Sequence, residues 1–222
     1  MRLYHGSDKI IDLPVFGGGK LNNDYGQGFY CTEIIDMARE WAVDSDRSGY
    51  VNIYDFEIEA LNVLNINDGY GDVLEWLAIL LDNRRFSINS PIALEGRRYI
   101  MDNFLLEYKS YDVIKGYRAD DSYFTFAQDF LNNTISLRQL SEAMKYRRLG
   151  EQVVLKSEKA FEYIKFYEYE RVDNKLWYPR KEERDRLARK RYFDLDKNKY
   201  VKGDLYIMHI LEKELKKNDI CI

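Results

Sequence analysis

YGQGFY, residues 25–30, marks the passage from a loop to a strand near the start of the chain. Its glycines end a polar loop that also contains GGG (17–19), and its aromatic end begins a strand expected over residues 28–32. A first short strand is expected upstream, over residues 3–5. The chain is therefore predicted to open with two strands that frame a long glycine-rich loop.

A helix is predicted directly after the second strand, over residues 34–43. Apolar residues recur there at helical spacing, Thr32 is the expected N-cap, and Trp41 is expected on the inward face. Further strands are expected over 50–58 and 63–66, from their alternating and β-branched residues.

Helices dominate the predicted remainder of the chain. One of them should begin with a capping box, in which Ser136 and Gln139 each bond the backbone of the other, and should end near Arg147. The other expected helices cover residues 72–81, 91–106, 120–131, 181–191 and 205–217. Extended segments are expected over 111–116, 152–156 and 160–170. The mixture predicts the α+β class.

The composition is that of a folded protein. The chain has 222 residues, of which 45% are hydrophobic and 32% charged, enough to bury a substantial core. No apolar run approaches the roughly 18 residues of a membrane helix, and no signal-peptide pattern follows Met1, so we expect a cytoplasmic protein with no membrane contact. Cys31 and Cys221, the two cysteines, are too few for a disulfide framework or a Cys-rich zinc site.

Three segments carry the functional prediction: LYHGS (3–7), YGQGFY (25–30) and GEQVV (150–154). Their order and strand contexts resemble the signature segments of the ADP-ribosyltransferases of the poly(ADP-ribose) polymerase and diphtheria-toxin-like group, which use a His-Tyr-Glu triad. The chain looks closer still to an uncharacterised bacterial domain family placed in that superfamily. The resemblance covers residues 3–42 and 150–166 well, whereas the middle agrees only in having helices between strands.

The resemblance implies a role for each matching residue. His5 would bond the adenosine ribose, the Gly6 backbone would hold the nicotinamide carboxamide, and Ser7 would assist nearby. Tyr30 would stack on the nicotinamide, and Trp41 would supply a second ring. Glu151 would bind the nicotinamide ribose, and Gly28 would let the backbone approach the ligand.

The chemistry of that family explains these residue types. Breaking the bond from ribose to nicotinamide gives an oxocarbenium-like transition state, which a nearby carboxylate stabilises. Aromatic faces attract the cationic nicotinamide ring. The catalytic residues are therefore expected to be Glu151, His5 and Tyr30, with NAD as co-substrate and no metal.

The resemblance also implies a fold and a domain organisation. It predicts an ADP-ribosyltransferase-like split β-sheet core, antiparallel or mixed, with inserted helices and a helical C-terminal tail. Residues 1–170 would form the catalytic domain, with a helical insertion at about 72–147. Residues 171–222 would form a charged helical extension packed on the same domain.

The expected activity is mono-ADP-ribosylation, because Gln27 stands where the better-known polymerases often carry Lys and no helical regulatory domain is evident. The protein would be toxin-like and would transfer ADP-ribose from NAD to a macromolecule, whether protein, RNA or DNA. A toxic activity would imply a neutralising antitoxin. Two alternatives stay open: an NAD glycohydrolase, and an inactive module that binds NAD, ADP-ribose or nucleic acid.

Other patterns favour ordinary structural explanations. GGGK (17–20) lacks the spacing of a phosphate-binding loop, so a mobile loop over the NAD pocket is the better prediction. Asp120 and Asp121 would point in different directions on a helix and better mark its start than a metal site. Residues 180–202 hold ten Lys/Arg against five Asp/Glu, which favours a solvated helix face over a nucleic-acid or acidic-partner surface.

Overall fold

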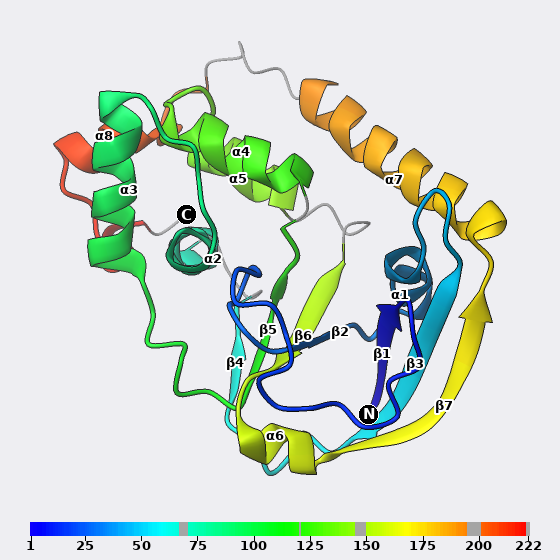
Figure 1. Cartoon of the computed structure of the whole chain (residues 1–222). Coiled ribbons are helices and arrows are strands. Elements are labelled where there is room, and N and C mark those ends of the chain that lie inside the picture. The colour runs from blue at the N-terminus through cyan, green and yellow to red at the C-terminus, as the bar shows by residue number, and fades with distance from the viewer. Residues whose placement is uncertain (67–70, 120, 145–149, 195–200, 221–222) are drawn as a thin grey trace.

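The computed structural model describes residues 1–66, 71–119, 121–144, 150–194 and 201–220. They form an α+β fold in which two β-sheets pack against each other and helices cover both outer faces (Figure 1). The fold class expected from the sequence is thereby confirmed.

The first sheet is antiparallel and has the strand order β1-β3-β7. Its strands are β1 (Arg2–Ser7), β3 (Gly49–Phe56) and β7 (Ile164–Val172). The register of β1 on β3 places His5 opposite Asn52. The third residue of the LYHGS segment therefore lies in the middle of the strand, and the segment's end leads into the loop over residues 8–28.

The second sheet is mixed and has the order β2-β6-β5-β4. Its strands are β2 (Phe29–Cys31), β6 (Glu151–Leu155), β5 (Val113–Tyr117) and β4 (Val63–Asn65), and only the β4–β5 pair is parallel. The main chains of Tyr4 and Thr32 exchange two hydrogen bonds of 2.9 Å, so β1 meets the free edge of β2. This contact brings two of the three signature segments together, and β6 brings the third.

Apolar side chains fill three layers around the sheets. Leu3, Cys31, Tyr54 and Val153 are buried between the two sheets. Helices α1 (Ile35–Ala42) and α7 (Asn174–Asp194) cover the outer face of the first sheet. The helices outside the second sheet are α2 (Gly71–Asn83), α3 (Pro91–Phe104), α4 (Asp121–Leu131), α5 (Leu137–Met144) and α8 (Ile207–Glu212). They share one apolar core with that sheet, and in this group α3 packs on α2 and α8 packs on α3, farther from the strands (Figure 1). Two short elements, α6 (Glu158–Glu162) and the 3₁₀-helix η1 (Lys217–Asp219), complete the described part.

The predicted capping box of α5 is confirmed. The Ser136 N–H donates to Gln139 Oε1 at 2.8 Å, and the Gln139 N–H donates to Ser136 Oγ at 3.2 Å. The predicted end of this helix near Arg147 lies outside the described residues.

Three local predictions are wrong. Thr32 is not the N-cap of α1, because Ile34 takes that position and Thr32 Oγ1 accepts the Ile34 N–H at 3.2 Å. The first part of the segment expected to be extended over 160–170 belongs to α6, because Ser157 Oγ caps that helix through the Ala160 N–H at 3.1 Å. The helix expected over 205–217 ends at residue 212, before Glu214 adopts a φ of 51°.

Within the described ranges, no helix combines the length and the apolarity needed to cross a bilayer. The same residues contain no group of three or more His, Cys, Asp or Glu side chains placed to bind a metal ion. Asp120, half of the acidic pair considered above, lies outside the description, and α4 begins at Asp121.

Candidate functional site

A cavity of about 760 Å³ lies where β1, β2 and the loop over residues 8–28 meet. Its volume is within the range of small-molecule sites, about 300 to 1,000 Å³. The predicted site residues that line it are His5, Gly6, Ser7, Gly28, Tyr30 and Trp41. The cavity therefore brings together residues from the first two signature segments and from α1.

His5 projects from β1 with its ring stacked on Phe29, at 4.4 Å between ring centroids. Its Nδ1 lies 2.7 Å from the Tyr30 carbonyl oxygen. Because a carbonyl only accepts, we assign the proton to Nδ1, which leaves Nε2 of the neutral ring as an acceptor. Burial lowers the pKa of His5, and the bond to the Tyr30 carbonyl opposes that shift. The side chain is thus a fixed, neutral imidazole with one acceptor nitrogen.

Tyr30 lines the cavity and also closes the loop that precedes it. Its hydroxyl donates to the Gly26 carbonyl at 2.6 Å and accepts the Tyr25 N–H at 3.1 Å. Burial raises the pKa of the phenol well above its ordinary range, so the hydroxyl stays protonated. The ring is therefore presented to the cavity in one orientation.

Tyr25 and Lys156 hold the same loop from the other side. The buried Tyr25 hydroxyl donates to the Tyr117 carbonyl at 2.6 Å. Lys156 Nζ donates to the carbonyls of Tyr25 and Gln27 at 2.5 and 2.6 Å, and burial lowers the pKa of this lysine to about 8. The YGQGFY segment is consequently fixed on β5 and β6.

Trp41 reaches the cavity from α1. Arg118 lies over its indole ring, with the guanidinium carbon 5.2 Å from the ring centroid. The Trp41 Nε1 atom is buried and has no hydrogen-bond partner among the described residues. A buried indole N–H normally finds an acceptor, so this donor suits an acceptor on a bound ligand.

The glycines of the site are required by close packing. A Cβ at Gly6 would lie 2.0 Å from the Ala38 carbonyl oxygen, and one at Gly28 would lie 2.7 Å from Val154 Cγ1. Gly6 thus lets α1 pack against β1, and Gly28 lets the loop run directly over β6. Both placements bring main chain to the cavity wall.

Ser7 is fixed by Asn52, a buried residue that the sequence did not single out as a site residue. Asn52 Nδ2 donates to Ser7 Oγ at 3.1 Å and to the Lys9 carbonyl at 3.2 Å, and Asn52 Oδ1 accepts the Ile11 N–H at 2.8 Å. The Asn52 side chain therefore holds the start of the loop over residues 8–28 in place.

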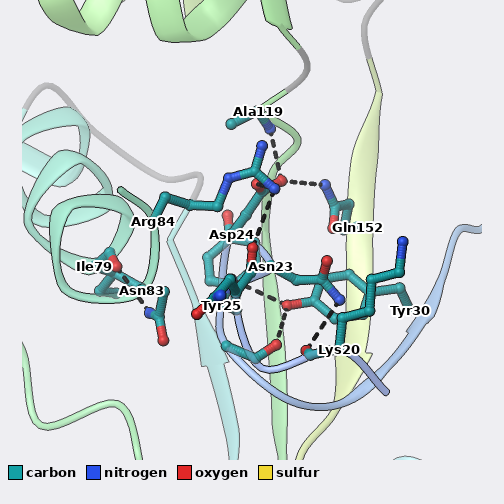
Figure 2. A network of polar contacts seen from close by, with 12 residues as sticks. Lys20, Asn23, Asp24, Tyr25, Tyr30, Ile79, Asn83, Arg84, Ala119 and Gln152 are labelled. Carbon is teal, nitrogen blue, oxygen red and sulfur yellow. Dashed lines mark hydrogen bonds and ion pairs between the residues drawn. The ribbon is translucent and has the colours of Figure 1, made fainter. Parts of the chain in front are cut away.

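A second group of cavity residues was missed by sequence reasoning: Asp24, Arg84 and Gln152 (Figure 2). Asp24 Oδ2 accepts the Ala119 N–H and Gln152 Nε2, both at 2.9 Å, and Asp24 Oδ1 lies 3.7 Å from Arg84 Nη1. Burial raises the pKa of the Asp24 carboxyl, while these donors and the charge of Arg84 oppose the rise. Its position directly before YGQGFY is the one sequence signal that could have identified it.

The charge of the cavity wall is uneven. Its lysine and arginine side chains are Lys9, Lys20, Arg84 and Arg118, and Asp24 is the one carboxylate among the described residues that line it. Such an excess of positive charge, beside aromatic rings, favours a ligand with anionic groups and a flat ring.

Glu151 lies outside this cavity lining. It is the first residue of β6, pairs with Tyr117, and its side chain is exposed. Gln152 is buried and faces the cavity, and successive strand residues point to opposite faces. Of the expected triad, His5 and Tyr30 line the cavity. Glu151 lies at the start of β6, and its side chain is outside the cavity lining.

A protein-family model described as "Protein of unknown function (DUF3990)" matches residues 1–166. The chain belongs to this family. The DUF3990 segment includes every residue that lines the cavity and ends within β7, so α7 and α8 lie beyond it. Neither the comparison with curated proteins nor that with solved structures finds a match.

Proposed function

We propose that the cavity binds NAD and that the protein transfers the ADP-ribose group of NAD to a macromolecular acceptor, with release of nicotinamide. The observation that carries the proposal is that His5, Tyr30 and Trp41, which come from three separate elements, line one cavity together with four cationic side chains and one carboxylate. An ADP-ribosyltransferase-like fold is part of the proposal, supported by the two packed sheets and the contact of β1 with β2.

The cavity's chemistry matches the parts of NAD. The diphosphate carries two negative charges, which the lysines and arginines of the wall would attract. The nicotinamide is a flat cationic ring, for which Tyr30 and Trp41 offer aromatic faces worth roughly 0.5 to 2 kcal/mol per good contact. The acceptor nitrogen of His5, Nε2, suits a ribose hydroxyl, which is a donor.

Three measurements on the purified chain test the proposal. Calorimetry measures NAD binding, chromatography measures nicotinamide release, and incubation of a cell lysate with NAD labelled in its adenylate part reveals labelled acceptors. Labelled macromolecules support transfer. Nicotinamide release without labelled macromolecules would indicate that the protein hydrolyses NAD. NAD binding without nicotinamide release would indicate a binding module. A chain that does not bind NAD at all would contradict the proposal.

A charge-matched pair of variants tests the site itself. Lys20→Gln removes a cation from the cavity wall, whereas Lys213→Gln removes an exposed cation at the end of α8. An exposed ion pair contributes about 0.2 to 1 kcal/mol, so we expect Lys20→Gln to weaken NAD binding up to about fivefold, and less at high salt. Lys213→Gln should bind as the wild type does. Equal affinities for both variants would argue against a diphosphate near Lys20.

A further inference from the structure

Asp24 is the carboxylate that the structure presents to the cavity. It is 6% exposed, and it is held from three directions by the Ala119 N–H, Gln152 Nε2 and Arg84 (Figure 2). Its neighbour Tyr25 is fixed on β5 through the bond to the Tyr117 carbonyl. The carboxylate therefore cannot turn away from the cavity without breaking contacts to β5, β6 and the end of α2.

Burial raises the pKa of the Asp24 carboxyl, and its hydrogen-bond and charge partners oppose that rise and favour its ionised form. A carboxylate accepts from every one of them, since a backbone N–H, an amide NH₂ and a guanidinium only donate. A carboxylate held in place in this way stabilises an opposite charge that develops during a reaction more than a mobile surface carboxylate does. Asp24 also acts on Tyr30, whose pKa its charge raises, so the two side chains are electrostatic neighbours.

Glu151 has none of these properties in the structure. Its side chain is exposed and lies on the face of β6 opposite to that of Gln152. At the position of β6 that faces the cavity, the chain carries a neutral carboxamide, which cannot supply a negative charge. Gln152 instead bonds to Asp24, so that β6 contributes to the site by holding a carboxylate that comes from the loop over residues 8–28.

We propose that Asp24, positioned by Gln152, is the catalytic carboxylate of the site, and that Glu151 is not required for the chemical step. This inference rests on the transfer reaction proposed above. In that reaction the bond from ribose C1′ to the nicotinamide nitrogen breaks, and its electron pair neutralises the pyridinium. A lone pair of the acceptor then forms the new bond to C1′, and the acceptor's proton leaves to solvent. Asp24 stabilises the positive charge on the ribose between these two events and is itself unchanged.

The test compares four variants with the wild type. Asp24→Asn removes the charge and keeps the size, and the oxygen of the new amide can still accept from the Ala119 N–H and from Gln152 Nε2. Glu151→Gln makes the same change at the carboxylate that the sequence predicts to be catalytic. The charge-swapped variant, Asp24→Asn combined with Gln152→Glu, places the negative charge on residue 152 in place of residue 24. Asp102→Asn, at an exposed position on α3, is the matched control.

Three readouts are needed: the thermal midpoint, the Kd for NAD, and the single-turnover rate of nicotinamide release. We expect Asp24→Asn to lower the release rate by about 10²- to 10³-fold, the usual cost of removing one such electrostatic group, with Kd changed less than about fivefold. Glu151→Gln and Asp102→Asn should stay within about threefold of the wild-type rate. The charge-swapped variant should recover at least about tenfold over Asp24→Asn, which a merely structural role of Asp24 would not allow.

Two outcomes would overturn the assignment: an Asp24→Asn rate near that of the wild type, or a Glu151→Gln rate reduced about 100-fold or more. If Asp24→Asn fails to fold, the charge-swapped variant decides, because a folded variant with no release activity contradicts the proposal. A wild-type chain that neither binds NAD nor releases nicotinamide removes the proposed function as well. If the wild type binds NAD and releases nicotinamide, but one of the two variant results above is found, only the assignment to Asp24 is contradicted.

Discussion

His5 is the cavity residue whose protonation we expect to couple to folding. Burial lowers the pKa of its imidazole below the ordinary value of 6.5. The unfolded chain therefore takes up a proton at this residue before the folded chain does, and the folded state loses stability as the pH falls from about 6.5 toward the lower folded pKa. We expect the wild-type thermal midpoint to fall more steeply below pH 6.5 than that of His5→Gln.

Thermal midpoints measured from pH 8 to pH 5 check this prediction. His209→Gln changes the other histidine, at the start of α8, and shows what the loss of a histidine side chain elsewhere does to the midpoint. Parallel profiles for the wild type and His5→Gln would show that His5 titrates alike in the folded and unfolded chains.

The residues of the site differ in how far the sequence could predict them. His5, Tyr30 and Trp41 belong to local patterns, and the structure places all of them at the cavity. Asp24, Arg84 and Gln152 meet only because β6 lies between β2 and β5 and because α2 ends beside the loop. A local pattern reports neighbours along the chain, so a contact between residues 24 and 152 lies beyond it.

Helix α7 packs beside α1 (Figure 1), and a buried ion pair between Arg184 and Glu40 joins the two helices. The two side chains are 11% and 10% exposed, and burial raises the pKa of Glu40 while Arg184 opposes that rise. Arg184→Met would leave the Glu40 carboxylate buried without its closest counter-charge. Such a loss costs about 3 to 5 kcal/mol, so we expect a decrease of about 3 kcal/mol in the free energy of unfolding at pH 7.

Urea denaturation at pH 7 and at pH 5 measures this effect. Without Arg184 the pKa of Glu40 rises further, so the carboxyl takes up a proton as the pH falls and the destabilisation should shrink toward pH 5. Arg186→Met, which removes an exposed partner of Glu183, should cost less than about 1 kcal/mol. A loss that is the same at both pH values would mean that Arg184 acts through packing and not through charge.

Among the elements, those with a strong period or a complete cap were predicted best. The capping box of Ser136 and Gln139 fixed the start of α5. The errors arose where two local preferences competed. Aromatic residues favoured a strand around residue 161, but the side chain of Ser157 caps a helical turn there. The helix over 205–217 was predicted from periodicity alone, which does not report the left-handed backbone at Glu214.

On the scale of the whole molecule, the hydrophobic core includes residues of the chain that lie beyond the family match. The match ends at residue 166, yet Ile207 and Ile210 of α8 are fully buried in the core that also covers the second sheet. Gly96 of α3 leaves room for this contact, because a Cβ there would lie 2.7 Å from Ile207 Cγ1. Arg138 of α5 adds a two-bond ion pair to Asp204, at 2.8 and 2.9 Å. The C-terminal segment therefore completes the core that supports β6 and the cavity.

This arrangement predicts that truncating a buried side chain of α8 destabilises the whole protein, although α8 lies far along the chain from the cavity residues. Ile210→Ala should lower the free energy of unfolding by about 2 to 5 kcal/mol, because the site is fully buried and packed against α3. Met208→Ala, at a position 40% exposed, should cost less than about 1 kcal/mol. Urea denaturation followed by far-ultraviolet circular dichroism measures both losses. A chain ending at residue 173 that still unfolds cooperatively, with the wild-type midpoint, would show that the second sheet and its helices are stable without α8.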